Sequence, residues 1–253
     1  MVDVMGKYKK SLILLDTVDS TNDWARANLS SFCPQSFTIV QAMQQTSGKG
    51  VSGPWHSPLA VGMYSSYVTF GLPNGNLSLM AYTAATSILQ MLDEMGLTAQ
   101  VKWPNDIRIS NKKIGGVLCE TASYEDKIAI IVGIGLNINT QRKDLDRIDQ
   151  PTTSIFLESG SVYCPAEIAD RLGDHLITNY DSYRQWGFSP FRSFLKDRLS
   201  YLGENIQIIT STQSVCGKFV GLANNGALQL QKSTGEILTF YSGKITAPSA
   251  EFQ

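Results

Sequence analysis

The sequence predicts an α+β protein: a mixed, largely antiparallel sheet covered by helices, followed by a small β-barrel of the SH3-like kind. Three observations support this fold class. Apolar or alternating runs of strand length recur through residues 11–139. Residues 77–92 and 165–186 carry apolar side chains at helical spacing. From residue 202 onward, short strand-like runs are separated by glycine turns. We therefore expect two domains, residues 1–200 and 201–253.

Composition narrows the class of protein. The chain has 253 residues, enough for one large and one small core, with 43% hydrophobic and 17% charged residues. The net charge of −1 argues against a nucleic-acid partner. The apolar run Leu12–Leu15 is too short to span a membrane, so we expect a soluble cytoplasmic protein. The four cysteines form no C-x-x-C pair, so buried free thiols are expected and a zinc site is not.

The first elements follow from local pattern. Residues 11–15 are typical of a buried strand. Ser20 or Thr21 is expected to cap a short helix that includes residues 24–29, because a hydroxyl there can accept a hydrogen bond from the first turn. A second strand is expected over residues 37–43.

Residues 44–58 predict a long loop, because three glycines and two prolines interrupt every periodic pattern. Successive backbone N–H groups in such a loop can form a nest that binds phosphate. On its own this signal is weak, since most glycine-spaced loops bind nothing. Residues 61–70 then predict a central strand, residues 72–76 a turn, and residues 77–92 a helix.

The stretch Lys102–Val117 predicts a β-hairpin. Its apolar and polar residues alternate from Ile107 to Ser110, and a polar turn follows in which Asn111 is the residue expected to be left-handed. An aspartate at one end, two lysines at the turn and a Gly-Gly pair suit an anionic ligand with Mg²⁺. The alternative is a solvated hairpin whose lysines face water.

The remaining elements complete the predicted fold. Residues 117–121 and 128–139 indicate two strands, and the second ends in G-x-G-x-N-x-N. It lacks the third glycine and the following helix of a dinucleotide-binding fingerprint, so that site is rejected. One short helix near Ser154 is expected before the long helix, and another over residues 190–199. The C-terminal strands are expected at residues 205–209, 215–222, 227–231 and 237–240, with turns at Gly226 and Gly235.

Several motifs together resemble one known family. They are S-T-N at residues 20–22, Q-T-x-G-K-G at 45–50, W-x-S-P at 55–58, K-W-P-N-D at 102–106, K-x-x-G-V-L at 113–118 and V-G-I-G-x-N-x-N at 132–139. This set resembles the biotin–protein ligases, in the monofunctional form without an N-terminal DNA-binding domain.

The resemblance implies a class II synthetase-like (biotin–lipoate ligase) catalytic fold. It implies an enzyme that uses ATP and Mg²⁺ to activate biotin as biotinyl-5′-AMP. The biotinyl group is then transferred to a lysine of a biotin carboxyl carrier protein domain. A monomer or homodimer is expected, with no membrane partner.

The resemblance also assigns roles to residues, with Lys113 and Lys49 as the catalytic candidates. Residues implied to bind biotin are Ser20, Thr21, Asn22, Gln45, Lys113, Gly116 and Gly133. Residues implied to bind ATP or the adenylate are Gly48, Lys49, Gly50, Trp55, Lys102, Asn105, Asp106 and Asn137. Asp106 is also the candidate ligand for Mg²⁺.

One loop departs from the family pattern, which is arginine-rich between its glycines. Val51 and Ser52 stand here in place of cations, and the loop is about one residue shorter before Trp55. With fewer charge-assisted contacts the loop is expected to close less tightly over the adenylate. Either the intermediate escapes more readily, or another residue supplies the missing contact.

Three alternatives to a biotin ligase follow. A lipoate or octanoyl transferase shares the expected catalytic fold. A homologue that binds biotin or the adenylate with weak or absent transfer is favoured only by the altered loop. A DNA-binding repressor is disfavoured by the charge and by the short segment before residue 11.

Overall fold

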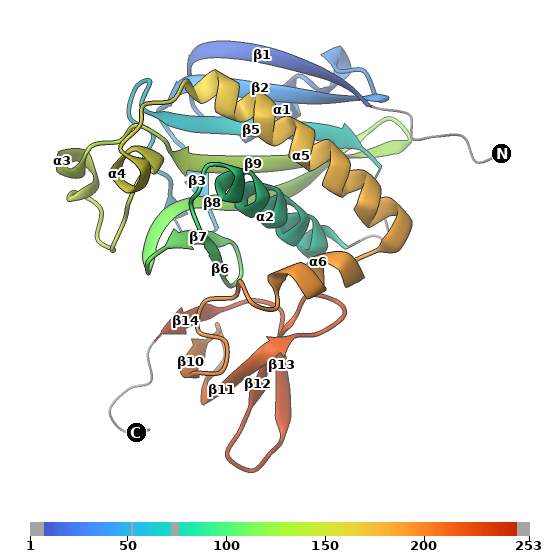
Figure 1. Cartoon of the computed structure of the whole chain (residues 1–253). Coiled ribbons are helices and arrows are strands. Elements are labelled where there is room, and N and C mark those ends of the chain that lie inside the picture. The colour runs from blue at the N-terminus through green and yellow to red at the C-terminus, as the bar shows by residue number, and fades with distance from the viewer. Residues whose placement is uncertain (1–7, 52, 72–75, 247–253) are drawn as a thin grey trace.

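A computed structural model describes residues 8–51, 53–71 and 76–246 of the chain. Its larger part is a seven-stranded sheet with helices on both faces, and its smaller part is a five-stranded C-terminal sheet below it (Figure 1). The predicted α+β class, with a mixed and largely antiparallel sheet, is confirmed.

The seven-stranded sheet has the order β1-β2-β5-β9-β8-β7-β6. Its strands are β1 (Lys9–Val18), β2 (Ser36–Gln45), β5 (Gly62–Phe70), β6 (Gln100–Lys102), β7 (Asp106–Ile109), β8 (Lys112–Tyr124) and β9 (Lys127–Asn137). β1 runs parallel to β2, and the other neighbouring pairs are antiparallel. The predicted hairpin is β7–β8, and its turn places Ser110 and Asn111 in the left-handed region.

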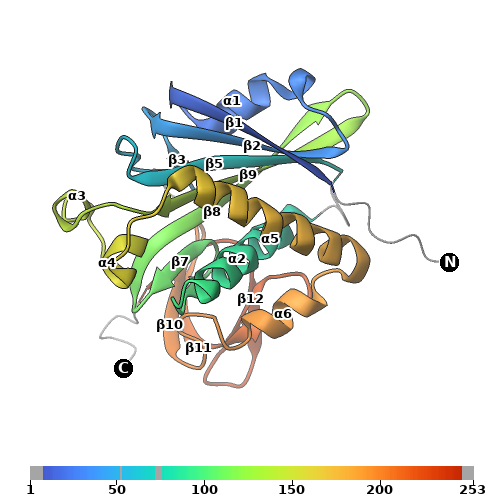
Figure 2. The same ribbon diagram turned by 45° about the horizontal axis from the view of Figure 1, so that its top comes forward.

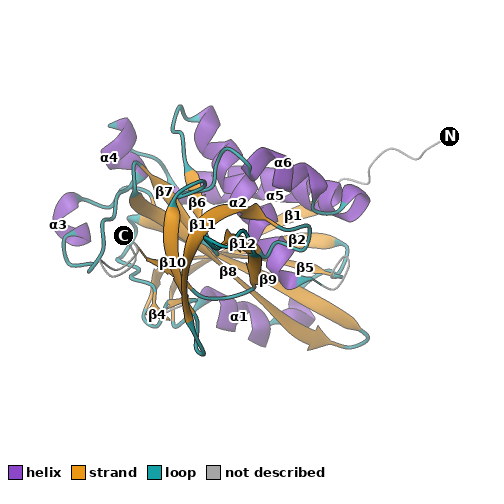
Figure 3. Cartoon of the chain, turned by 90° about the horizontal axis from the view of Figure 1, so that it is seen from below, coloured by secondary structure: helices purple, strands orange, loops and turns teal. Residues whose placement is uncertain are grey.

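Helices cover the two faces unequally. The helices are α1 (Thr21–Ala27), α2 (Leu77–Glu94), α3 (Arg142–Leu145), α4 (Ile155–Ser159), α5 (Pro165–Trp186) and α6 (Ser189–Leu195), with a 3-10 turn η1 (Leu29–Ser31). α2 and α5 pack against each other over one face, and α1 covers the other (Figures 2 and 3). The helix expected over residues 190–199 is α6, which ends earlier than predicted, at Leu195.

The N-cap predicted at Ser20 is present, and Ser154 caps the short helix that was expected near it. The side chain of Ser20 accepts a hydrogen bond from the backbone N–H of Asp23, and Ser154 does the same for Leu157. These contacts satisfy orphan donors in the first turns of α1 and α4. The same start of α1 carries Thr21 and Asn22, whose side chains contact Ser66 of the central strand β5.

The prediction of a buried first strand is wrong. β1 is an edge strand that pairs only with β2 within the described residues, and Leu14 is 62% exposed. An apolar run fits a buried strand and a half-exposed edge equally well, because the pattern does not say which neighbours cover it.

The prediction that residues 44–58 form no element is partly wrong. Within them β3 (Lys49–Gly50) pairs with β4 (Gly53–Pro54) as a two-residue ladder. The backbone N–H of Trp55 donates to the carbonyl of Gly48 at 2.8 Å, which closes the base of this hairpin. The turn expected at residues 72–76 lies mostly outside the described residues.

The cysteines are less buried than expected. Cys33 and Cys164 are exposed, while Cys119 and Cys216 are half-buried. Composition did not distinguish these positions, because exposure depends on which elements pack over each residue.

The C-terminal module is a five-stranded antiparallel sheet of order β13-β12-β11-β10-β14. Its strands are β10 (Asn205–Ile209), β11 (Ser214–Leu222), β12 (Leu228–Gln231), β13 (Ile237–Phe240) and β14 (Lys244–Thr246). Gly226 and Gly235 turn the chain with positive φ, as predicted. β14 was not predicted, because three residues carry too little pattern. Closure into a barrel stays a prediction.

The C-terminal module docks on α2, and the connection that leads into it contacts β6 and α2. The Tyr82 hydroxyl donates to the carbonyl of Gly226 at 2.7 Å. In the connection before the module, Leu199 bridges to Val101 of β6, and Arg198 forms a two-pronged ion pair with Asp93 of α2 at 2.9 and 3.0 Å. Apolar side chains of both parts belong to one continuous core. The module is therefore fixed against the edge of the large sheet that carries β6 and β7.

Candidate active site

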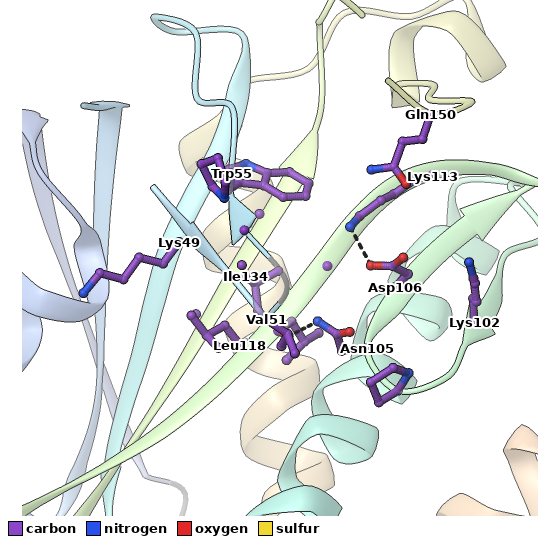
Figure 4. A pocket seen from close by; sticks show the side chains of 18 of the residues that line it. Lys49, Val51, Trp55, Lys102, Asn105, Asp106, Lys113, Leu118, Ile134 and Gln150 are labelled. Atoms are coloured by element: carbon purple, nitrogen blue, oxygen red, sulfur yellow. Dashed lines mark hydrogen bonds and ion pairs between the residues drawn. The ribbon is translucent and has the colours of Figure 1, made fainter. Parts of the chain in front are cut away.

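One cavity of about 410 Å³ opens beside the β7–β8 hairpin. Its walls come from the start of α1, the end of β2 with the β3–β4 hairpin, the β6–β7 connection, the centres of β8 and β9, residues 149–150, and the start of β14. Figure 4 shows Trp55 and Lys113 facing each other across it, with Asp106 and Lys102 beyond Lys113.

Hydroxyl and amide groups form one end of the cavity, which we call the ring end (Ser20, Thr21, Asn22 and Gln45). The backbone N–H and hydroxyl of Thr21 both donate to Gln45 Oε1, at 2.9 and 3.1 Å. The Ser66 hydroxyl, fully buried on β5, lies 2.8 Å from Thr21 Oγ1 and 2.5 Å from Asn22 Oδ1. These mutual hydrogen bonds hold the polar groups in fixed orientations, which suits recognition of a small ligand with polar groups.

Two glycines of β9 make room for side chains of the site. A Cβ on Gly133 would lie 2.5 Å from Asn22 Oδ1, and one on Gly135 would lie 2.5 Å from Trp55 Cε2. Real Cβ atoms do not approach so closely, so each glycine is needed for a neighbour rather than for a turn. The G-x-G pattern therefore lets Asn22 and Trp55 lie flat against the sheet.

One hydrogen bond and three ion pairs connect the ring end to the β3–β4 hairpin. Asn22 donates to Glu120 at 2.7 Å, and Glu120 pairs with Arg26 at 2.8 Å. Arg26 also pairs with Asp23 at 3.2 Å, and Asp23 pairs with Lys49 Nζ at 2.6 Å. In Figure 4 the Lys49 side chain accordingly extends away from Lys113 and Asp106.

The opposite end of the cavity is charged. Lys113 Nζ lies 2.5 Å from Asp106 Oδ1 and 5.4 Å from the centroid of the Trp55 ring. The backbone of Lys113 donates to Pro151 at 2.9 Å and accepts from Thr153 at 2.8 Å. The ammonium is thus aimed into the cavity by a fixed strand, with 18% of the side chain exposed.

The second lysine of the hairpin turn is directed elsewhere. Lys112 pairs with Glu158 at 2.8 Å, and Thr153 donates to the same carboxylate. Burial by itself raises the pKa of Glu158, but the hydrogen bonds from Lys112 and Thr153 outweigh it, so the pKa lies below its usual range. Only Lys113 of the pair therefore lines the cavity.

Asn105 and Trp55 contribute in different ways. The Asn105 side chain donates to the carbonyl of Val117 at 2.8 Å, and the backbone N–H of Val117 donates back to Asn105 at 3.0 Å. These bonds tie the K-W-P-N-D turn to β8. The Nε1 of Trp55 is buried and has no hydrogen-bond partner among the described residues. A buried unpaired donor carries a free-energy cost, so a ligand acceptor fits beside it.

Comparison with known proteins identifies the family. The profile of the biotin/lipoate A/B protein ligase family matches residues 14–137, and that of the biotin protein ligase C-terminal domain matches residues 201–246. The bifunctional ligase/repressor BirA of Bacillus subtilis is 31% identical over 96% of this chain and 75% of its own length. The chain belongs to the biotin protein ligase family. The biotin--[acetyl-CoA-carboxylase] ligase of Paracoccus denitrificans is also 28% identical, over 88% of this chain and 95% of its own length.

Solved structures of the family share the fold. The biotin protein ligase of Aquifex aeolicus, in complex with biotin and ATP, matches with a TM-score of 0.79 and 28% identity. The match covers 93% of this chain and 97% of that one. The fold expected from the family resemblance is thereby confirmed, including the C-terminal antiparallel module.

The cavity of this biotin protein ligase relative gathers most of the residues singled out from sequence. Those that line it are Ser20, Thr21, Asn22, Gln45, Lys49, Gly50, Trp55, Lys102, Asn105, Asp106, Lys113, Gly116 and Gly133. Gly48 instead lines the adjoining hollow beneath the β3–β4 hairpin. Asn137 is buried behind the wall, where its amide donates to Thr153 at 3.0 Å. Neither Gly48 nor Asn137 lines the main cavity, so each is placed to support the residues of its wall and not to contact a ligand there.

Several lining or supporting residues were missed. Ser66 and Glu120 hold the ring end, and Gln150 stands beside Lys113 in Figure 4. Gly243, Lys244 and Ile245 reach the cavity from the C-terminal module. None belongs to a motif, and no local signal links residue 244 to a hairpin at residue 106.

The residues fit Mg²⁺ only in a limited way. Within the described residues no cluster of three or more His, Cys, Asp or Glu side chains could hold a metal ion alone. Mg²⁺ is commonly held by one or two carboxylates together with substrate phosphates and water. The cavity offers the carboxylates of Asp106 and Asp149, which suits an ion that arrives with ATP.

Proposed function

We propose that this chain is an ATP-dependent biotin–protein ligase that forms biotinyl-5′-AMP and transfers the biotinyl group to a lysine of a biotin carboxyl carrier protein domain. The observation that carries this proposal is a single cavity in which a polar ring end adjoins a lysine-rich end. Membership of the biotin protein ligase family makes the two ends the expected places for biotin and nucleotide.

In the first step a biotin carboxylate oxygen attacks the α-phosphorus of ATP, and the bond to pyrophosphate breaks. Both reactants are anions, so positive charge must offset their repulsion. We assign this role to Lys113, because its ammonium is aimed into the cavity between Trp55 and Asp106. Asp106 would hold Mg²⁺ with the phosphates, and the ion would neutralise charge on the leaving group.

In the second step the amine of the acceptor lysine attacks the carbonyl of the mixed anhydride, AMP leaves, and the amine loses a proton. No described side chain in the cavity is an evident base for that proton. Orientation of the two reactants accounts for the step in this scheme.

The proposal is tested with labelled biotin, ATP, Mg²⁺ and a purified carrier domain. We expect label on one lysine of the carrier, dependent on ATP and Mg²⁺ and lost with a carrier Lys→Arg variant. Lipoate or octanoate offered in place of biotin should not be transferred. Transfer of either acid at the rate of biotin would support the transferase alternative instead.

A second candidate function is binding of biotin or the adenylate with weak transfer. It is favoured by the side chains of the loop. Val51 is uncharged and 55% exposed, and the ammonium of Lys49 is paired with Asp23, so the loop directs no unpaired cation to the ligand. Formation of biotinyl-AMP without labelling of any carrier would establish this function. Prompt labelling of the carrier would exclude it.

No helix among the described residues is long and apolar enough to cross a membrane. We propose a cytoplasmic enzyme that acts as a monomer or homodimer on its carrier domain. Size-exclusion chromatography with light scattering, with and without biotin and ATP, measures the oligomeric state.

A further inference from the structure

The lysines of the cavity differ in how their charge is used. Four lysines line it: Lys49, Lys102, Lys113 and Lys244. Lys49 is paired with Asp23 at 2.6 Å and Lys113 with Asp106 at 2.5 Å. For Lys102 and Lys244, no carboxylate lies within ion-pair distance in the parts of the chain that the structure describes. Their charge is therefore not shared with a described carboxylate of the protein.

Lys102 and Lys244 approach the cavity from the side opposite α1. Lys102 lies opposite Asp106 in the backbone register of the β6–β7 ladder. In Figure 4 it is farther from Trp55 than Lys113 is. Lys244 begins β14, which lies below β6 in Figure 1. The ring end belongs to α1 and β2. The two lysines thus stand at the end of the cavity away from the proposed biotin ring.

The backbone of Lys244 is fixed, although its side chain is exposed. Its strand pairs with β10 at Ile209, and the next residue, Ile245, is 3% exposed within the shared core. The Tyr82–Gly226 hydrogen bond holds the module against α2, and the Val101–Leu199 bridge holds the preceding connection against β6. Because the backbone is already held, only the Lys244 side chain has to be ordered when a ligand binds.

We propose that Lys244 binds the β- and γ-phosphates of ATP, so that the C-terminal module takes part in the adenylation step. This inference rests on the proposed function. The triphosphate tail carries most of the nucleotide's charge, and a lysine ammonium is a point charge suited to phosphate oxygens. Because Lys49 is held by Asp23, Lys244 supplies a cation that the arginine-poor loop lacks.

The proposal separates the two half-reactions. Pyrophosphate leaves in the first step, so a residue that binds the β- and γ-phosphates has no ligand in the second step. Lys244→Ala should therefore raise the KM for ATP in biotinyl-AMP formation about tenfold, as loss of one charge-assisted contact predicts. The KM for biotin and the rate of transfer from preformed biotinyl-AMP to the carrier should be unchanged.

Two further variants keep the test specific. Lys244→Arg retains a cation and should keep the KM for ATP close to the original value. Lys218→Ala removes an exposed lysine of the same module that does not line the cavity, and should change neither half-reaction. Thermal unfolding of all three variants should match that of the original chain.

Binding without turnover gives an independent readout. An ATP analogue with a methylene bridge between the α- and β-phosphates, titrated in the presence of biotin, should bind Lys244→Ala about tenfold more weakly. An unchanged Kd, or an equal loss in both half-reactions, would overturn the role of Lys244. If the original chain binds the analogue but never labels a carrier, the proposed function fails while the role of Lys244 is still tested.

Discussion

The β7–β8 hairpin and the β3–β4 loop both carry charge to one cavity, but they do so in opposite ways. On the hairpin, Lys113 and Asp106 are paired and only 18% and 22% exposed. Backbone bonds to residues 151 and 153 hold Lys113 in place. On the loop, Lys49 is 47% exposed and reaches outward to Asp23.

Lys113 and Lys49 differ in what orients their side chains. A lysine within a sheet is oriented by strand pairing before any ligand arrives. A lysine on a two-residue ladder is oriented by whichever carboxylate it meets. Here that carboxylate belongs to the protein, so the loop is held by an internal ion pair and contributes little charge to the cavity.

The largest expected effect tests the hairpin. Lys113→Ala removes the cation assigned to the carboxylate and α-phosphate and should lower the rate of adenylation about 10²- to 10³-fold. Pyrophosphate exchange dependent on biotin measures that rate. Lys112→Ala is the matched control, because Lys112 pairs with Glu158 instead. Unchanged exchange in Lys113→Ala would remove this residue from the mechanism.

The second-largest expected effect tests Trp55, which lines the cavity opposite Lys113. Trp55→Ala removes the ring that lies against Gly135 and near Lys113. If the adenine of ATP stacks on this ring, the KM for ATP should rise roughly 10- to 30-fold, consistent with loss of one base-stacking contact. Steady-state kinetics of adenylation measure it. Trp186→Ala, on an exposed side chain of α5, should leave the KM unchanged. If both variants behave alike, adenine does not stack on Trp55.

A gain of charge on the loop should have a smaller effect. Val51→Arg offers a guanidinium at the cavity rim and should slow escape of biotinyl-AMP about tenfold, the size of one charge-assisted hydrogen bond. Release is followed by trapping the freed intermediate. Val51→Leu changes the side chain without charge and should not slow release. Equal release from both variants would mean that charge does not limit closure of the loop.

The smallest expected effect tests the loop's internal ion pair. Asp23→Ala removes the ion pair that anchors the loop to α1, so escape of biotinyl-AMP should become about threefold faster, because a partly exposed ion pair contributes less than about 1 kcal/mol. Added salt should speed escape from the original chain and have less effect on the variant. Asp126→Ala, at the exposed β8–β9 turn, serves as control. Slower escape from Asp23→Ala would show that the pair opposes closure.

Much of the fold and the site followed from local sequence. Turn residues, alternation and helical spacing located the β7–β8 hairpin, the long helices and most C-terminal strands. The capping role of Ser20 and the close-packing glycines of β9 were also local, since each depends on backbone geometry that few residue types allow. These features place most of the predicted site residues around one cavity.

Other features depended on which distant segments meet. β1 is exposed because no further strand covers it among the described residues, and Lys49 faces outward because Asp23 lies within 2.6 Å. Lys244 reaches the cavity because a module whose first strand begins at Asn205, far along the chain from the hairpin, docks on α2. The sequence by itself determined backbone conformation and the chemical types in the site, because these rest on near-neighbour sterics and periodicity. Only the tertiary structure decided which charges are paired and which are free, because ion pairing depends on distances that no local pattern contains.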